Sequence, residues 1–455
     1  MKRINWLKPL FLYGMMGLLF AGMFSCNDNN KPDPIYRVTV TLVYPGDYPP
    51  VEGIMVKLEN PTSKLIFEEP TNASGVAEFY VIAGTYTASA SESRVVELVN
   101  IIFSGSVNQF VSEECNISLP LGAIEQEQIC IKELYVGGCQ RDDGTSFQYD
   151  SYVILYNNSG EPATLKNTCL GMVNPYNSNG TNNDYVDGAL KYANQGWIPA
   201  GQAIWTFPQS VTIDPGKQIV IALKNAIDNT QTVPNAIDFN NSAYYCTYDP
   251  EVFPNETYYK PPAPAIPSSH YLKAYFWGAG NAWTLSVTSP AFFIFAIPEG
   301  LTPQAFVDDI DSYQDQYNNS ATAANARRKV SVDWVIDGIE VYNYGAANNS
   351  KRLTPAVDAG YVEHRSQYGF TLYRNVDKEA TEALPENEGK IVYGYSLGTV
   401  GYTIPGLEDG IIDGSTDPSG IDAEASIQNG ARIVYKDTNN SSNDFHMRSR
   451  ASLKD

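Results

Sequence analysis

The sequence holds one string that could carry nucleophilic catalysis. Residues 394–398 read Gly-Tyr-Ser-Leu-Gly, the G-x-S-x-G spacing in which a strained strand-to-helix turn exposes a hydrolase serine, Ser396. His446 follows with aspartates between, so the order of a Ser-Asp-His triad is nominally present. Residues 399–406, however, are rich in glycine and β-branched types and cannot supply the helix that the turn requires. We therefore expect a glycine-rich hairpin and no enzyme, with a serine hydrolase as the distant alternative.

An acidic, glycine-rich stretch offers oxygen ligands for a hard cation. Residues 408–422 contain Asp409, Asp413 and Asp417, and carboxylates in turn-rich loops suit Ca²⁺. The spacing departs from that of an EF-hand, and Asp-Gly pairs are first of all turn formers. Solvated turns are the main expectation and a calcium site is the alternative. No other cofactor is expected, because the three histidines lack the close spacing of a two-histidine metal site.

A segment dense in Tyr, Trp, Pro and Asn is the best candidate for ligand binding. It runs from about residue 240 to residue 283, and its rings would present rigid, amphipathic surface of the kind favoured at recognition sites and on sugars. The alternative is that the rings fill the core between this segment and the rest of the fold. The candidate residues are Tyr244, Tyr245, Tyr258, Tyr259, Tyr271, Trp277 and Trp283.

The charge balance excludes one class of partner. The formal net charge is −21, with 51 acidic and 30 basic residues. A nucleic-acid-binding surface requires a basic patch or stripe, so no nucleic-acid partner is expected. The same balance disfavours adsorption to anionic lipid.

The N-terminus has the parts of an export signal. A basic start, a short apolar stretch and small residues before Cys26 make a secretory signal over residues 1–25. Residues 23–26, Met-Phe-Ser-Cys, resemble a bacterial lipobox, in which the cysteine is lipidated after cleavage. Residues 26–35 are polar and contain proline, as expected of a lipidated tether. The resemblance implies a membrane partner through the anchor and an outer-membrane location, facing the cell exterior, with the periplasmic face as the alternative.

The pattern that follows the tether indicates an all-β chain. Short alternating strands recur at roughly ten-residue spacing and are separated by Gly and Pro, which is typical of a β-sandwich. The strings "TNASGVAEF" and "AGTYTASA" resemble the transthyretin-like or carboxypeptidase-regulatory-like sandwich, over residues 36–122. That resemblance implies a spacer or interaction role.

The remainder, residues 127–455, resembles a second β-sandwich. "ICIKELYVGG", "YVILYNNSGEP" and "IDPGKQIVIA", with a hairpin-like turn at residues 214–216, resemble the lamin-tail type of immunoglobulin-like fold. Two stretches, about 224–332 and 376–433, would be insertions into it. The whole chain thus resembles Bacteroidetes surface lipoproteins that are classed only as a domain of unknown function.

Three further features are expected. Residues 291–297 are continuously apolar between two prolines, which predicts a buried strand. Residues 302–317 predict a helix, because Thr302 can cap it, Pro303 fits its first turn and apolar residues repeat on one face. Disulfides are permitted outside the cytoplasm, and their pairing is open among Cys115, Cys130, Cys139, Cys169 and Cys246.

These features lead to one functional expectation and its alternatives. The expected function is a non-catalytic binding or accessory lipoprotein that works with an outer-membrane β-barrel transporter to capture a nutrient such as a glycan or peptide. A structural adhesion or surface-assembly protein is the main alternative, because the same sandwiches could serve as spacers.

Overall fold

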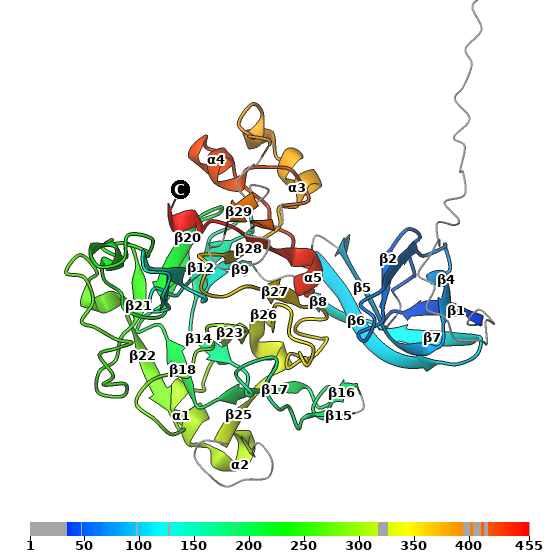
Figure 1. Cartoon of the computed structure of the whole chain (residues 1–455), viewed down its shortest axis with the longest axis horizontal. Coiled ribbons are helices and arrows are strands. Elements are labelled where there is room, and N and C mark those ends of the chain that lie inside the picture. The colour runs from blue at the N-terminus through cyan, green and yellow to red at the C-terminus, as the bar shows by residue number, and fades with distance from the viewer. Residues whose placement is uncertain are drawn as a thin grey trace, which may run out of the picture.

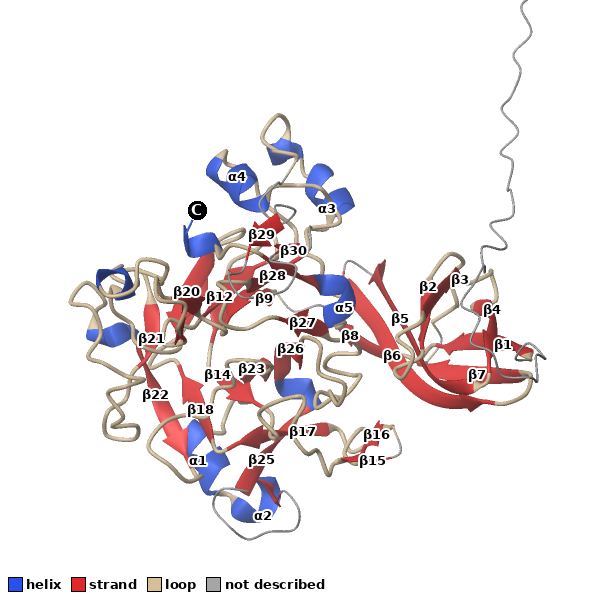
Figure 2. Cartoon of the chain, in the orientation of Figure 1, coloured by secondary structure: helices blue, strands red, loops and turns tan. Residues whose placement is uncertain are grey.

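The described chain is built mainly of β-strands (Figures 1 and 2). The structure is a computed structural model that describes residues 34–46, 48–96, 99–125, 128–186, 188–316, 326–394, 401–403, 411–413 and 417–454. Its helices are few and short, so the all-β prediction is confirmed. The signal, the tether up to residue 33 and Cys26 lie outside the described residues.

The N-terminal part forms a small two-sheet sandwich. One sheet has the order β4-β1-β7 and the other β3-β2-β5-β6-β8. The strands are β1 (Ile35–Val43), β2 (Met55–Glu59), β3 (Ile66–Pro70), β4 (Val76–Ile82), β5 (Gly84–Val96), β6 (Val99–Val111), β7 (Cys115–Pro120) and β8 (Gly122–Glu125).

Alternation of residue types decides which side of each strand faces inward. In β1, Val38, Val40 and Leu42 are buried, whereas Thr39 and Thr41 between them are partly exposed. The inward residues of both sheets make one apolar cluster, and its buried members all lie between Val38 and Leu121. The sandwich therefore has its own core.

The rest of the chain is organised by one twelve-stranded sheet. Its order is β27-β26-β23-β14-β18-β22-β21-β20-β12-β9-β28-β31. The strands are β27 (Val362–His364), β26 (Val335–Asn343), β23 (Ala291–Ala296), β14 (Thr168–Met172), β18 (Ala203–Thr206), β22 (Tyr271–Phe276), β21 (Tyr245–Thr247), β20 (Gln218–Ala222), β12 (Tyr152–Asn157), β9 (Ile129–Tyr135), β28 (Thr371–Arg374) and β31 (Phe445–Arg448).

The two ends of this sheet approach each other. β26 contacts β9, and β27 contacts both β28 and β31, although these strands stand far apart in the hydrogen-bonded order. One apolar cluster contains residues from both ends, among them Ile131, Leu155, Leu170, Phe292 and Ile339. The sheet is thus bent over a shared core, as a sandwich is.

Strand β23 shows that the sheet is buried on both faces. Phe292 and Ile294 belong to the core enclosed by the sheet, whereas Phe293 and Phe295 belong to a second cluster on the opposite face. This accounts for the continuous apolar run between two prolines, and the prediction of a buried strand is confirmed. The second cluster is covered by β17 (Trp197–Gly201), β25 (Ala326–Ser331) and α1 (Pro303–Asp308).

The structure differs from the expected division into a core and insertions. The stretch of residues 224–332, expected as an insertion, contributes β21, β22 and β23 to the interior of the sheet. The turn at residues 214–216 forms, with Gly216 at a φ of 67°. Its flanking strands do not pair with each other, because β19 (Val211–Ile213) pairs with β13 (Ala163–Leu165) and β20 pairs with β12.

The expected helix over residues 302–317 is present but divided. Thr302 caps α1 by accepting a hydrogen bond from the Ala305 amide at 3.1 Å, as predicted. Asp309 leaves the helical conformation and caps α2 (Ile310–Tyr313) in turn. The next residues join the short strand β24 (Gln314–Gln316) rather than extending the helix.

The remaining elements are short. They are β10 (Cys139–Gln140), β11 (Ser146–Phe147), β15 (Tyr185–Val186), β16 (Ala189–Leu190), β29 (Gly401–Thr403), β30 (Ile411–Asp413), α3 (Lys378–Glu382), α4 (Ala423–Gln428) and α5 (Ser441–Asp444). In the part of the chain that is described, no helix has the length and hydropathy needed to cross a bilayer.

The small sandwich lies beside the larger body, and polar contacts join the two (Figure 1). The Tyr361 hydroxyl donates to Glu59 Oε1 at 2.7 Å, and the Ser91 hydroxyl donates to the Thr438 carbonyl at 2.6 Å. The Asn108 amide also donates to the Gly188 carbonyl in the β15–β16 hairpin. These contacts fix one face of the small sandwich against the body.

Arg374 links the two ends of the large sheet where they approach each other. Its guanidinium, fully buried at the end of β28, pairs with Asp337 on β26 and donates to the Ile131 carbonyl on β9 at 2.7 Å. Asp437 at 3.1 Å and Asp444 at 3.7 Å complete its carboxylate surroundings. Asp337 in turn accepts the Ile131 amide at 2.6 Å, so three distant strands share one polar centre.

Replacing Arg374 by Met should therefore destabilise the body severely. The variant would leave three buried carboxylates without their cation, a change that costs about 3–5 kcal/mol in the free energy of unfolding. Urea unfolding followed by circular dichroism measures it. Lys166→Met is the control, because the Lys166–Glu299 pair is 59% and 87% exposed and should contribute less than about 1 kcal/mol. An Arg374→Met protein as stable as the wild type would contradict this account.

Candidate functional site

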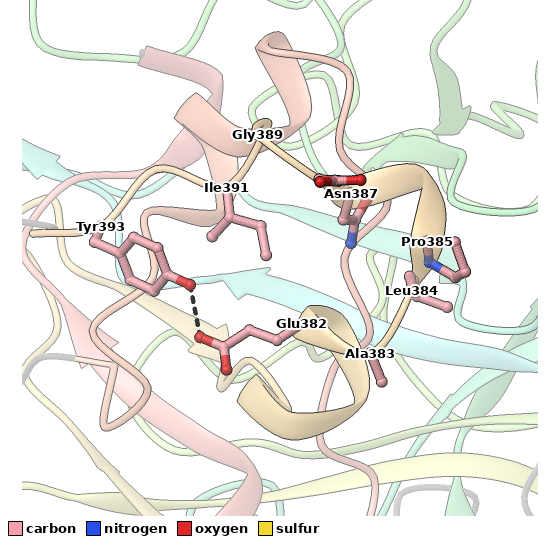
Figure 3. Close-up of a pocket in the computed structure, with 9 residues that line it drawn as sticks. Glu382, Ala383, Leu384, Pro385, Asn387, Gly389, Ile391 and Tyr393 are labelled. Atoms are coloured by element: carbon pink, nitrogen blue, oxygen red, sulfur yellow. Dashed lines mark hydrogen bonds between the residues drawn. The ribbon is translucent and has the colours of Figure 1, made fainter.

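The candidate site is a surface hollow of about 630 Å³ on the helical segment that follows β28 (Figure 3). Its walls come from the end of α3, the single helical turn Pro385–Asn387, and residues 388–393. Its lining residues are Glu382, Ala383, Leu384, Pro385, Asn387, Glu388, Gly389, Ile391 and Tyr393.

Local capping and one buried amide shape this hollow. Asp377 begins α3 by accepting the Ala380 amide at 3.0 Å. The Asn387 side chain, almost fully buried, donates to the Thr381 and Arg432 carbonyls at 2.8 and 2.7 Å. Its oxygen accepts the Arg432 amide at 2.8 Å, so the turn is clamped to the segment after α4.

The chemistry of the hollow comes from one ring and one carboxylate. Tyr393 is 53% exposed, and its hydroxyl donates to Glu382 Oε1 at 2.6 Å, which raises the pKa of the phenol. Lys378 Nζ lies 5.8 Å from the centre of the same ring. Figure 3 shows the Tyr393 ring, Ile391 and Glu382 around the same space. The hollow combines an exposed aromatic face, an apolar side chain and a hydrogen-bond acceptor.

The aromatic residues predicted as a ligand surface mostly pack inside the body. Tyr245, Tyr259 and Trp283 are buried, and Tyr259 and Trp283 lie against the fully buried Trp205, with ring centres 5.9 and 6.5 Å away. The other four, Tyr244, Tyr258, Tyr271 and Trp277, are half-buried and pack against three different apolar clusters. The seven rings therefore do not form one platform, and the core-filling alternative describes their packing.

The acidic stretch is described only in part. Asp409 lies outside the described residues, and of Asp413 only the backbone is described. Asp417 is buried, and its carboxylate accepts the amides of Val376 at 2.8 Å and Ser419 at 2.9 Å. Its described role is to close a loop, and no cluster of potential metal ligands occurs among the residues searched, which are the described ones.

The serine-hydrolase alternative can be followed only at its histidine. Ser396 lies outside the described residues. His446 is buried in β31, with Nδ1 2.7 Å from Asn375 Oδ1, and burial lowers the pKa of its ring to about 3. The His446 ring is therefore neutral and bonded to an amide, which is typical of a residue with a structural role. The five described cysteines, Cys115, Cys130, Cys139, Cys169 and Cys246, are free thiols.

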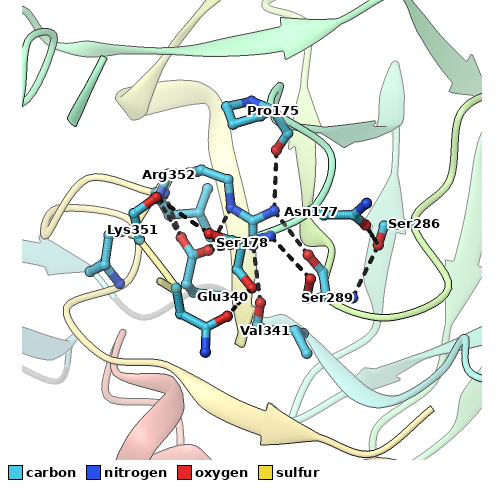
Figure 4. A network of polar contacts seen from close by, with 12 residues as sticks. Pro175, Asn177, Ser178, Ser286, Ser289, Glu340, Val341, Lys351 and Arg352 are labelled. Carbon is cyan, nitrogen blue, oxygen red and sulfur yellow. Dashed lines mark hydrogen bonds and ion pairs between the residues drawn. The ribbon is translucent and has the colours of Figure 1, made fainter. Parts of the chain in front are cut away.

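A buried ion pair accounts for another polar cluster (Figure 4). Arg352 Nη2 lies 2.6 Å from Glu340 Oε1, and both side chains are fully buried. Arg352 also donates to the carbonyls of Tyr176 and Ser289, each at 2.9 Å. Glu340 accepts the amides of Arg352 and Leu353 at 2.8 and 2.7 Å. The donors and acceptors of the pair are engaged within the protein, so it organises loops.

Asp150 is a buried carboxylate that is only partly satisfied. Its Oδ2 accepts the Ile237 amide at 3.1 Å and the Tyr135 hydroxyl at 3.4 Å, while Oδ1 has no partner among the described groups. Burial raises the pKa of Asp150 to about 6. Burial also lowers the pKa of nearby Lys224 to about 8. Asp150 therefore disfavours the folded state once it is ionised.

Asp150→Asn should remove a pH dependence of stability. The pKa of Asp150 is higher in the folded protein than in the unfolded chain. The free energy of unfolding of the wild type therefore falls as pH rises from about 4 through about 6. Asparagine stays neutral, so the variant should be more stable than the wild type above pH 7 by about 2–3 kcal/mol, and little different at pH 4. Urea unfolding across this range measures the difference. The exposed Asp142→Asn is the control, and parallel pH profiles for Asp150→Asn and wild type would contradict the assignment.

The described chain is a two-part, mainly β protein, and comparison with known proteins adds a family match over part of the chain. Residues 214–393 match the family described as "Protein of unknown function (DUF4876)". This match includes β21–β23, β26–β28, α3 and the lining of the hollow up to Tyr393. No curated protein matches the chain.

Solved structures from three organisms are similar to parts of the chain. A DUF4876 family protein from Bacteroides thetaiotaomicron is 18% identical, with 90% of this chain and 94% of that chain covered and a TM-score of 0.49. A DUF3823 family protein from Parabacteroides merdae is 12% identical, with 31% and 67% covered and a TM-score of 0.17. The major pilin subunit BcpA of Bacillus cereus is 10% identical, with 70% and 99% covered and a TM-score of 0.17.

No local pattern in the sequence predicts the hollow. Tyr393 stands directly before the glycine-rich string of residues 394–398. The hollow arises because Asn387 and Arg432, 45 positions apart, are hydrogen-bonded in the folded chain. A contact between residues so far apart in the chain forms only on folding and leaves no pattern in the local sequence.

Proposed function

We propose that this chain is a lipid-anchored, non-catalytic binding protein of the bacterial cell surface, which uses the hollow at Tyr393 to capture a nutrient. The observation that carries the proposal is the hollow itself. It is open to solvent, and it combines an exposed ring with apolar and carboxylate groups, which are kinds of side chain that line small-ligand sites.

The contrast between this hollow and the polar clusters of the interior supports the choice of site. Arg352, Glu340 and Arg374 are buried and bonded within the protein, so they have little surface to offer a ligand. Tyr393 and Glu382 are exposed, and their mutual hydrogen bond holds the ring in one orientation. A ring that is already fixed loses little conformational entropy on binding.

The ligand class that fits is a short glycan. The C–H face of a sugar ring packs against an exposed tyrosine ring, and sugar hydroxyls can donate to carboxylate oxygens such as those of Glu382 and Glu388. A peptide is the competing ligand, and it would use the same apolar wall at Leu384 and Ile391.

Tyr393→Ala tests the hollow. Screening of the purified protein on a panel of oligosaccharides, followed by calorimetry with the best binder, should show affinity reduced at least about tenfold in the variant, the loss of about 1.4 kcal/mol of ring contact. Tyr344→Ala is the matched control, because Tyr344 is similarly exposed (45%) and lies outside the hollow. Equal affinities for Tyr393→Ala and wild type would remove the hollow from the proposal, and selective binding of peptides would reassign its ligand.

The proposed partner is an outer-membrane β-barrel transporter that takes up the captured ligand. The proposal of an anchored capture protein supports it, since a ligand held at the surface must still be carried inward. A tagged pull-down from detergent-solubilised outer membrane, with proteins identified by mass spectrometry, should recover a barrel in about equal amount. Recovery of the chain alone, or of copies of itself, would instead favour the adhesion or surface-assembly role.

A further inference from the structure

One end of the small sandwich carries a concentration of exposed apolar side chains. This end, called the entry end below, is where β1 begins, and the register places Ile35 opposite Ile82 and Gly84 opposite Val111. The most exposed side chains here are Ile35 (68%), Tyr80 (62%) and Phe110 (62%). Six of the thirteen large apolar side chains that are exposed in the described chain lie at this end, namely Ile35, Leu65, Ile66, Tyr80, Ile82 and Phe110.

A gathering of this kind indicates a surface that contacts something. Single exposed apolar residues are ordinary on soluble proteins, whereas a contiguous group marks an interaction site. The group surrounds the end of the sandwich, with Ile35, Tyr80 and Ile82 on the outer face of one sheet and Phe110 on the outer face of the other. It therefore suits a broad surface more than a narrow groove.

The path of the chain indicates which surface lies near the entry end. The described chain enters the sandwich at this end, whereas β8 leaves for the body beside Ile101–Ser104, well along β6 from Phe110. Cys26 precedes Ile35 by nine residues, which can span at most about 30 Å. An acyl chain on Cys26 would hold the entry end within that distance of the bilayer.

We propose that the entry end rests on the lipid surface, with Ile35, Tyr80, Ile82 and Phe110 in the headgroup region. This inference rests on the proposed lipidation of Cys26. Residues with apolar bodies, and Tyr with its polar tip, favour the boundary between headgroups and acyl chains. The body lies beside the sandwich, and the contacts at Glu59, Ser91 and Asn108 would set its orientation.

The charged residues at the entry end indicate which class of lipid headgroup it would contact. Arg37 and Glu78 pair with each other at 2.5 Å on the outer face, so they leave little net charge. Glu113 and Glu114 are exposed in the turn between β6 and β7. Lys64 beside Leu65 is also exposed, but the two exposed glutamates outnumber it, so the surface fits zwitterionic headgroups, such as phosphatidylethanolamine or phosphatidylcholine, and is repelled by anionic lipid.

Tryptophan fluorescence of the lipidated full-length protein tests the contact. The variant Phe110→Trp is reconstituted in phosphatidylcholine–phosphatidylethanolamine vesicles that contain brominated phosphatidylcholine, and the wild-type emission is subtracted. A ring about 5–10 Å into the boundary should lose at least about half of the added emission. Met55→Trp is the matched control, because Met55 is 51% exposed at the far end of the same sandwich and should not be quenched.

The remaining outcomes either support or overturn the proposal. Adding Ile82→Ser to Phe110→Trp should weaken the quenching, as should phosphatidylglycerol in the vesicles, and unchanged thermal melting shows that the variants fold. Equal quenching of Phe110→Trp and Met55→Trp, or none in either, overturns the lipid contact. Protection of the Phe110→Trp ring from aqueous acrylamide only when a membrane protein is added would assign the surface to that protein instead.

The mass of the N-terminal peptide separates this failure from a failure of the anchor. An acylated Cys26 without quenching removes the lipid contact and leaves the anchored binding protein in place. An unmodified Cys26 removes the anchor and, with it, this inference, while the Tyr393 site is still judged by its own binding measurement.

Discussion

The bent sheet depends on one buried cation. Arg374 meets Asp337 and the Ile131 carbonyl where the two ends of a twelve-stranded sheet come together, and Asp337 accepts the Ile131 amide as well. Apolar packing alone would favour closure without fixing its register, because hydrophobic contacts are not directional. A charged pair that must keep its hydrogen bonds when buried permits few alignments. The polar centre thus makes the bent sheet specific at a cost in desolvation.

The same centre sets the position of the surface that we propose binds a ligand. Arg374 ends β28, and three residues later Asp377 donates its amide to the Val434 carbonyl at 2.8 Å before capping α3. Val376 donates to buried Asp417 in the same stretch. A short covalent path therefore leads from the closed core to the helix that carries Glu382. The hollow is shaped by contacts that lie beneath it, while Tyr393 and Glu382 are exposed at its surface.

Local patterns in the sequence predicted much of the fold, and long-range pairing limited the rest. Some features involve only residues that are close together in the sequence, so they could be predicted from it. They are the alternation in β1, the apolar run of β23 and the Thr302 cap. The residues around Tyr245 and Tyr271 were expected to decorate the fold, yet their strands β21 and β22 lie inside the sheet through parallel pairing with distant partners. The aromatic density there reflects a core, because aromatic side chains supply large buried area as readily as they supply binding surface. The hollow was not predictable, since it depends on the clamp between Asn387 and Arg432.

Burial on both faces explains why the chemistry of this protein lies at its margins. The large sheet is covered on its outer face by β17, β25 and the helices, and on its inner face by its own bent-over strands. The buried ion pairs Arg374–Asp337 and Arg352–Glu340 accordingly bond within the protein. The exposed side chains that we propose to make contacts lie at two places far apart along the described chain, the hollow after β28 and the entry end of the small sandwich. The proposed division between an attachment end and a capture site matches this distribution, since each proposed function needs surface that the closed core does not require.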